Sequence, residues 1–277
     1  MKIAWFTDIH LDCVEDPIYH VERMSVQAKQ ADAIFITGDL SVSNKLMLHL
    51  KILEEILEKP IFFILGNHDV YFSDVQSIRK SVTQGCNGLS FCRYLSSIPY
   101  IRLSKGVTLV GHDGWCDAGN GDLNLSEVIM NDWLRIADYR PALVPVARGT
   151  QISKPKIAEI ARNICASSVR HVLQGIKCAI QEKSEKVIIL THVPPFAESF
   201  VFSPSKGMSA VHALPWYTSK MMGNMLLNAA QSCPQIQFTV MSGHTHAAFD
   251  EKILDNLTVK VGASEYGSPS LAGFLDI

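Results

Sequence analysis

Short apolar runs recur along this chain, and most of them stop abruptly at a cluster of Gly, Asp, Asn or His. The runs are rich in β-branched and aromatic residues, which is typical of buried strands. There are eight of them: KIAWF (2–6), AIFIT (33–37), PIFFIL (60–65), VTLV (107–110), KVIILT (186–191), FTVMS (238–242), LTVKV (257–261) and GFLDI (273–277). This pattern predicts a fold that is built around buried β-sheets.

Helical periodicity fills the gaps between the early runs. It extends over 17–30, over 43–58, where four leucines share one face, and over about 73–83. The first third of the chain is therefore βαβαβ, which requires parallel strands and a layered α/β architecture. A longer helical stretch at about 153–183 precedes the fifth run, and little helix is expected between the later runs. We expect one domain over 1–277, with two sheets packed face to face and helices at their sides.

Composition and charge exclude several classes of protein. Of the 277 residues, 47% are hydrophobic and 19% charged, so disorder is not expected. A net charge of -2 and a pI near 6.5 give no basic surface for nucleic acid or anionic lipid. The first apolar run breaks at Asp8, too early for a signal peptide or a membrane span. The seven scattered cysteines indicate reduced thiols, and we expect a cytoplasmic protein with no membrane partner.

Polar clusters follow five of the runs directly. They are Asp8-Ile9-His10, Gly38-Asp39, Gly66-Asn67-His68-Asp69, His192 and Gly243-His244-Thr245-His246. Ligands of α/β sheets bind beyond the carboxyl ends of the strands, so these clusters are expected to converge on one place. Asp8 and His10, like His244 and His246, are two apart and would share a face if the backbone is extended.

Each cluster taken alone has an ordinary structural explanation. Asp8 and His10 could form a surface turn, and Asp39 or Ser41 could simply cap a helix. Likewise, the GNHD segment could be a polar turn, and His192 could be a buried core histidine. The pair in GHTH could be exposed. All five explanations would have to hold together, each at a strand end, which makes a common site the better interpretation.

The donor types indicate metal chemistry. Carboxylates, an amide oxygen and imidazoles, without thiolate, suit a catalytic first-row metal such as manganese, iron, zinc or nickel. The donors exceed what one ion needs. Two ions about 3.5 to 4 Å apart would need a bridging carboxylate, and such a pair can hold a phosphoryl oxygen and activate water. The pattern therefore predicts hydrolysis at phosphorus.

The ordered series D-x-H, G-D, G-N-H-D, H and G-H-T-H resembles that of the calcineurin-like metallophosphoesterase superfamily, and it spans residues 8 to 246. This resemblance implies a four-layer α/β/β/α sandwich of two mixed sheets flanked by helices. It also implies two divalent metal ions. By position, the first ion would be bound by Asp8, His10 and His246, the second by Asn67, His192 and His244, with Asp39 bridging the two.

The resemblance also implies a mechanism. A metal-bridging hydroxide would attack phosphorus, and His68 would assist the leaving group. Asp69 would orient the His68 imidazole, as carboxylates do for other functional histidines. Asn67 and His68, as neighbours on an extended turn, would face different ways and would not bind the same ion.

Within the superfamily, the motifs favour a bacterial-type phosphodiesterase over a phosphomonoesterase. Protein Ser/Thr phosphatases carry G-D-x-V-D-R-G and G-N-H-E, whereas this chain has GDLSVSN and GNHD. The THVPP segment (191–195) is similar to the diesterase pattern, although Thr191 stands where that group often has a second histidine. The expected partner is a small phosphate ester. A non-catalytic scaffold would be expected to have lost ligands, and a nuclease would be expected to have a basic groove.

Two long segments are expected to form a rim over the metals, as insertions near 111–150 and 196–220. In the first, the GHDGWCDAGNGD stretch (111–122) offers His112, Asp113, Trp115 and Asp117 for substrate contact. In the second, the helix-poor stretch 196–217 offers Phe196, His212 and Trp216 to stack on an aromatic leaving group. The alternative is that the first segment is an irregular surface loop and that the aromatic side chains of the second pack it down.

Overall fold

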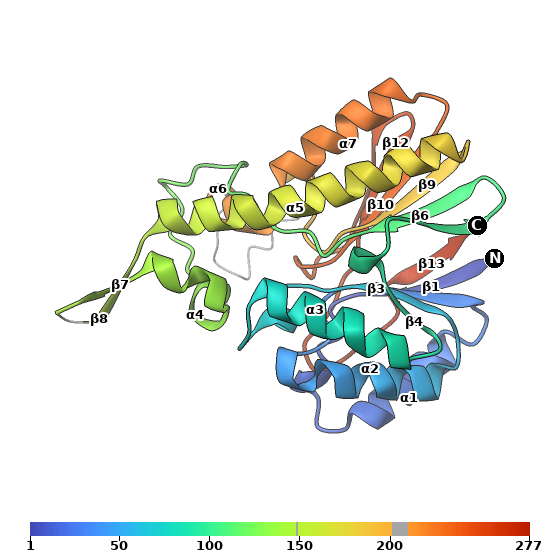
Figure 1. Cartoon of the computed structure of the whole chain (residues 1–277), viewed down its shortest axis with the longest axis horizontal. Helices are drawn as coiled ribbons and strands as arrows, with labels where there is room; N and C mark the ends of the chain where they lie inside the picture. Colours follow the sequence, from blue (N-terminus) through green and yellow to red (C-terminus); the bar gives the residue numbers. More distant parts are fainter. Residues whose placement is uncertain (148, 201–209) are drawn as a thin grey trace.

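The computed structural model describes residues 1–147, 149–200 and 210–277. Two sheets lie face to face between two helical layers (Figure 1). The first sheet has the order β13-β1-β2-β3-β4 and the second β11-β12-β10-β9-β6-β5. This architecture confirms the predicted α/β fold of two mixed sheets flanked by helices.

The first sheet is parallel except at one edge. Its strands are β1 (Lys2–Phe6), β2 (Ala33–Thr37), β3 (Ile61–Ile64), β4 (Cys92–Tyr94) and β13 (Gly273–Asp276), the last antiparallel to β1. Helices α1 (Pro17–Gln27), α2 (Ser43–Leu57) and α3 (Val75–Gly85) cover its outer face (Figure 1). The first third of the chain is therefore βαβαβ, as its periodicity predicts.

The second sheet has a parallel centre and two antiparallel edges. Its strands are β5 (Ile101–Ser104), β6 (Val107–Gly111), β9 (Lys186–Leu190), β10 (Gln237–Ser242), β11 (Phe249–Leu254) and β12 (Leu257–Val261). Helices α5 (Lys154–Gln181) and α7 (Lys220–Ser232) cover its outer face (Figure 1). The sequence pattern misses the edge strands β5 and β11, since β11 reads FDEKIL and exposes its charged residues.

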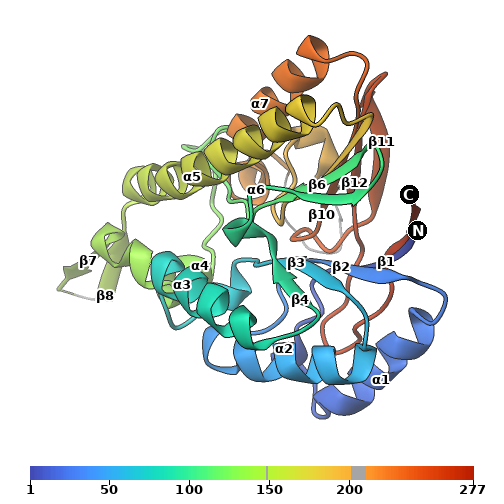
Figure 2. The same ribbon diagram turned by 45° about the vertical axis from the view of Figure 1, so that its right-hand side comes forward.

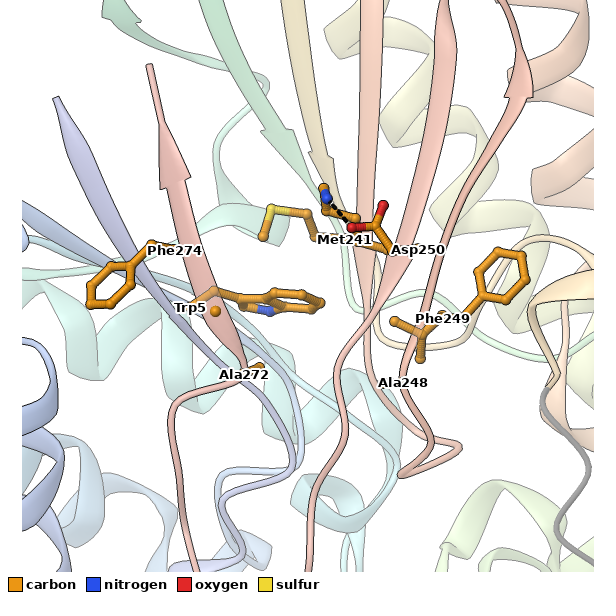
Figure 3. Close-up of a pocket in the computed structure, with 10 residues that line it drawn as sticks. Trp5, Met241, Ala248, Phe249, Asp250, Ala272 and Phe274 are labelled. Atoms are coloured by element: carbon orange, nitrogen blue, oxygen red, sulfur yellow. Dashed lines mark hydrogen bonds and ion pairs between the residues drawn. The ribbon is translucent and has the colours of Figure 1, made fainter.

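The core is divided among the layers. On β1, Ala4 and Phe6 pack toward the helices, whereas Ile3 and Trp5 pack between the sheets with residues such as Ile188. The central strands are buried on both faces, which explains their uninterrupted apolar sequences. Figure 3 shows Trp5 extending from β1 toward the second sheet, beside a pocket of about 340 Å³ that Met241 and Phe249 also line.

The segment between β6 and α5 forms a small structure of its own. It contains α4 (Asp132–Arg135), a six-residue 3₁₀ helix (Ala137–Ala142) and the hairpin of β7 (Leu143–Val146) and β8 (Gly149–Ile152). The hairpin projects beyond the N-terminal end of α5 (Figures 1 and 2).

The segment between β9 and β10 is more helical than expected. It contains α6 (Ala210–Tyr217) and α7, so the prediction of little helix in this region was wrong. The stretch 196–217, expected to be helix-poor, ends in α6, while its residues 201–209 lie outside the described part of the chain. No helix of the described residues has both the length and the apolar character to cross a membrane.

Candidate metal centre

The five polar clusters follow β1, β2, β3, β9 and β10, and residues from three of them, those after β2, β3 and β10, line one pocket of about 150 Å³. Two sheets contribute, because the carboxyl ends of their parallel strands point to the same side. The pocket is lined by Asp39, Asn67, His68, Tyr71, Ile129, Met130, Asn131, Tyr217, His244, His246 and Tyr266.

Four predicted ligands form a compact first cluster. One ligand atom from each of Asp8, His10, Asp39 and His246 lies within 4.8 Å of the others. His246 Nε2 is 3.2 Å from Asp8 Oδ1, and His10 Nε2 is 3.7 Å from Asp39 Oδ2. Both carboxylates are buried.

The second cluster shares Asp39 with the first. His192 Nε2 lies 3.4 Å from Asp39 Oδ1 and 3.1 Å from Asn67 Oδ1. The rings of His192 and His244 are 5.1 Å apart. One oxygen of Asp39 therefore faces each cluster, which is the arrangement that a bridging ligand needs.

The backbone at these ligands is left-handed. Of nine described non-glycine residues with positive φ, five are predicted ligands: Asp8 (49°), His10 (40°), Asp39 (53°), His244 (69°) and His246 (57°). The expectation of extended D-x-H and H-T-H segments was therefore wrong. Asp and His tolerate this conformation better than most residues, and such strain persists where the surrounding fold imposes it. Sharp turns, rather than strand alternation, aim these side chains at the site.

Two glycines are required by the space that the carboxylates occupy. A Cβ at Gly66 would lie 2.1 Å from Asp39 Oδ1, and a Cβ at Gly243 would lie 2.1 Å from Asp8 Oδ2. Any side chain at either position would displace a predicted ligand. The G-N-H-D and G-H-T-H motifs begin with glycine for this reason.

The histidines differ in their electrostatic surroundings. Burial lowers the pKa of His10 to about 4 and that of His244 to about 3, so both are neutral near pH 7 and offer a lone pair. Burial opposes charge on His192 too, but Asp39 outweighs it and raises the pKa of His192 to about 10. In turn, although burial alone would raise it, His192 holds the pKa of Asp39 well below its usual range. A positive charge beside the Asp39 carboxylate is therefore electrostatically favourable.

His68 lines the pocket and is half-buried. It begins a 3₁₀ helix (His68–Val70), and its backbone N–H donates to Asp39 Oδ1 at 2.9 Å. Its ring stacks on Tyr71 with centroids 4.3 Å apart, and its Nε2 is 3.4 Å from the Tyr266 hydroxyl. The expectation that Asn67 and His68 lie on an extended turn was wrong, because both residues start this helical turn. Their side chains nevertheless face different ways, as expected.

Asp69 has a different role from the one expected. Its two carboxylate oxygens accept hydrogen bonds from the backbone N–H groups of Ser41 and Gly66, both at 2.8 Å. Asp69 therefore joins the loop after β2 to the loop after β3 instead of orienting the His68 imidazole. Burial and the nearby Asp39 charge raise the pKa of Asp69 well above its usual range.

The expected substrate residues all lie outside the described lining of the pocket. Asp113 is buried and accepts from Arg79 Nε (2.7 Å), Ser96 Oγ (2.6 Å), the Tyr94 hydroxyl and the Leu65 backbone N–H. Beside it, His112 is buried with its ring 5.0 Å from that of His171. These contacts assign the two residues to the interior, and the prediction of a surface loop at this point was also wrong.

The remaining candidates are also held by the protein. Trp115 is buried and donates from Nε1 to the Tyr139 hydroxyl at 2.7 Å, and Asp117 accepts from the backbone N–H of Met221 at 2.6 Å. Phe196 packs in the core between the second sheet and its helices, and Trp216 is buried against Trp133. His212 is half-buried on α6, and its carbonyl accepts from Ser126 Oγ. Their geometry favours the packing alternative.

Sequence reasoning missed several residues at the centre. Tyr71, Tyr217 and Tyr266 line the pocket, together with Ile129, Met130 and Asn131 from the 111–150 segment. Asp132, next in the chain, accepts from Asn67 Nδ2 at 2.9 Å. No motif marks these residues. Tyr71 follows the 3₁₀ helix after β3, and Tyr217 ends α6, whereas the others reach the centre through the fold of the segment between β6 and α5 and of the chain between β12 and β13.

The donor set fits divalent metal ions. His10 Nε2 and His246 Nε2 face each other at 3.3 Å beside the two carboxylates, an arrangement that a cation bound between the nitrogens would satisfy. Within the described residues, His10 Nδ1 is buried without a hydrogen-bond partner. Two carboxylates, an amide oxygen and four imidazoles are the donors that manganese, iron, zinc and nickel accept.

Comparison with known proteins agrees with this geometry. The family profile described as "Calcineurin-like phosphoesterase" matches residues 1–248. Among solved structures, the chain is similar to the phosphopantetheinyl hydrolase PptH from Mycobacterium tuberculosis, with a TM-score of 0.64 and 12% identity over 96% of this chain and 90% of that one. It is also similar to a dimetal phosphatase from Danio rerio, with a TM-score of 0.55 and 12% identity over 95% and 87% of the two chains. No curated protein matches the sequence.

Proposed function

Because the chain belongs to the calcineurin-like phosphoesterase family and is a metal-dependent phosphoric ester hydrolase, we propose that it binds two divalent ions and cleaves small phosphodiesters in preference to monoesters. Asp39 carries this proposal. Its two oxygens face two different histidine clusters.

The ligands divide between two subsites. Asp8, His10 and His246 would hold the first ion, and Asn67, His192 and His244 the second, with Asp39 between them. Two ions held there supply charge neutralisation for the phosphoryl group and activate water for attack on phosphorus.

His68 is the proposed general acid for the leaving alkoxide. It lines the pocket, and its ring is held by Tyr71 on one side and by Tyr266 near Nε2. Proton donation from Nε2 to the departing oxygen would prevent a strongly basic alkoxide from leaving unprotonated. The hydrogen bond from the His68 backbone N–H to Asp39 fixes the position of His68 relative to the predicted ligands.

The pocket wall supports the preference for diesters. Beyond the ligands and His68, the described lining residues are Tyr71, Tyr217, Tyr266, Ile129, Met130 and Asn131, all uncharged. A diester carries one negative charge and an organic group on each side, whereas a monoester presents a second charge that this wall does not match. The THVPP segment agrees with this assignment.

The proposed setting is the cytoplasm, with a small phosphate ester as partner and neither membrane nor nucleic acid involved. All seven cysteines are free thiols in the structure, which suits a reducing compartment. The net charge of -2 suits a small substrate better than a polyanion.

Steady-state hydrolysis of p-nitrophenyl phosphate and of bis(p-nitrophenyl) phosphate, each with added MnCl₂, tests the proposal. We expect a higher kcat/KM for the bis ester. A higher value for the monoester would contradict the diester preference. No turnover of either by protein that contains two ions per chain would instead favour a non-catalytic scaffold. The Asp39→Asn variant, purified in parallel, controls for contaminating phosphatases.

A further inference from the structure

Asp132 connects the segment between β6 and α5 to the metal centre. It lies at the start of α4 and is buried, with 6% of its surface exposed. One of its oxygens, Oδ1, accepts two hydrogen bonds, from Asn67 Nδ2 at 2.9 Å and from the Tyr71 hydroxyl at 2.8 Å. Both donors belong to the loop that follows β3.

The bond to Asn67 fixes the orientation of its amide. An asparagine side chain has a donor end and an acceptor end, and a carboxylate only accepts. With Nδ2 directed at Asp132, Oδ1 must face the opposite way, where it lies 3.1 Å from His192 Nε2. The reversed amide would set its oxygen against a buried carboxylate, which costs free energy.

The bond to Tyr71 extends the same control to His68. The Tyr71 hydroxyl donates to Asp132, and the Tyr71 ring stacks on the His68 imidazole at an angle of 29°. Tyr71 is itself buried, so its ring has little freedom once the hydroxyl is held. One carboxylate thus restrains both a predicted metal ligand and the proposed general acid.

We propose that Asp132 is a positioning residue that keeps the Asn67 oxygen directed at the second metal subsite and, through Tyr71, holds the His68 ring in place. The proposal rests on the dinuclear function given above and adds an asymmetry to it. Within the described chain, the side-chain hydrogen bonds of Asp132 go to Asn67 and Tyr71, and none goes to the subsite formed by Asp8, His10 and His246. Loss of Asp132 should therefore lower the affinity of the second subsite for its ion and leave the affinity of the first unchanged.

Two substitutions separate the charge of Asp132 from its acceptor oxygen. Asp132→Asn keeps an oxygen that can accept from Asn67, whereas Asp132→Leu has a similar size and no acceptor. Contacts of this kind to metal ligands contribute roughly 10- to 100-fold in affinity. We expect Asp132→Leu to weaken one Mn²⁺ site by that factor and Asp132→Asn to weaken the same site by less.

Titration of metal-free protein with MnCl₂, followed by calorimetry and by electron paramagnetic resonance, measures both sites without any substrate. The wild type should bind two ions and show a spin-coupled pair. At one to two equivalents, Asp132→Leu should retain one tight, uncoupled ion. Asp138→Asn is the matched control, because Asp138 lies in the same segment and accepts from the Val75 backbone away from the pocket lining.

The outcomes are distinct. Two unchanged affinities in both Asp132 variants, or an equal loss at both sites, would overturn the positioning role. If thermal unfolding in EDTA shows that Asp132→Leu does not fold, Asp132→Asn decides alone, and it must weaken one site selectively. A wild type that binds fewer than two ions would contradict the dinuclear function itself.

Turnover gives a second readout. His68 should be less well held in Tyr71→Phe, which keeps the ring and loses the bond to Asp132. We expect kcat to fall while both Mn²⁺ affinities stay at their wild-type values. An unchanged kcat would remove the Tyr71 branch of the proposal and leave the Asn67 branch standing.

Discussion

The polar segments after β3 and after β6 look alike in sequence but differ in their surroundings. Gly66-Asn67-His68-Asp69 follows the buried strand β3, and His112-Asp113-Gly114 follows the last residue of β6, Gly111. In the first, Asn67 and His68 line the pocket over the clustered ligands. In the second, Asp113 is enclosed by Arg79, Tyr94 and Ser96.

The difference lies in what the polar atoms face. The carboxylate of Asp113 has protein donors on both oxygens and a guanidinium beside it, so its charge is balanced within the fold. At the metal centre, two imidazole nitrogens face each other across 3.3 Å beside two buried carboxylates. A buried cluster of polar groups that do not satisfy one another's hydrogen bonds and charges indicates a ligand-binding site. A cluster whose groups are all satisfied by protein partners indicates a structural role.

The largest effect on activity is expected from Asp39→Asn, which alters the carboxylate that the two proposed metal subsites share. Asparagine keeps one oxygen but replaces the other with an NH₂ group that cannot bind a cation, and it carries no charge, so we expect metal content below two ions per chain. The expected loss of kcat/KM exceeds the roughly 10,000-fold that a general acid contributes at most. Metal analysis and kinetics on the bis ester measure both. Retention of two ions with near-normal turnover would show that Asp39 is not the bridge.

A smaller effect is expected from His68→Ala, which leaves every predicted ligand in place. Turnover should fall by roughly 100- to 10,000-fold because the leaving oxygen loses its proton donor. Metal content should stay at the wild-type value. Unaltered turnover would exclude the general-acid role, and loss of metal would place His68 among the ligands instead. An ester with a p-nitrophenolate leaving group should be less affected than an alkyl ester, since it needs less protonation.

The smallest effect on catalysis, and a clear one on stability, is expected from Asp113→Asn in the cluster that protein partners satisfy. Burial alone would raise the pKa of Asp113, but Arg79 and several donors lower it from 3.8 to about 2. The ionised form therefore stabilises the fold by about 2 kcal/mol above pH 4. Because the folded-state pKa is the lower one, this contribution is lost as pH falls from about 4 to about 2.

Urea unfolding between pH 2 and pH 7 measures this contribution. The variant should be less stable than the wild type by about 2 kcal/mol at pH 7 and should lack the part of the acid dependence that belongs to Asp113. The kcat of the folded variant should stay close to that of the wild type. A selective loss of activity without loss of stability would return Asp113 to the group of functional residues.

The sequence predicted more of the metal centre than of its supports. All seven predicted ligands gather after the strands, and the βαβαβ order of the first third was evident from periodicity. The role of Asp69 was missed because the position after a histidine does not reveal which backbone groups its carboxylate will meet. Asp132 was missed because its partner Asn67 lies 65 residues away, in a different part of the fold.

By itself, the sequence determined which donors are present and where the strands end. Apolar runs fix the strands through burial, and parallel strands carry whatever follows them to one side of a sheet. The tertiary structure alone decided which buried polar groups find hydrogen-bond and charge partners within the protein and which are left to face a ligand. The physical reason is that hydrogen-bond partners of buried groups come from segments distant in sequence. Asp113 therefore meets Arg79 in the interior, while within the described residues the Asp39 carboxylate meets predicted ligands and the His68 backbone.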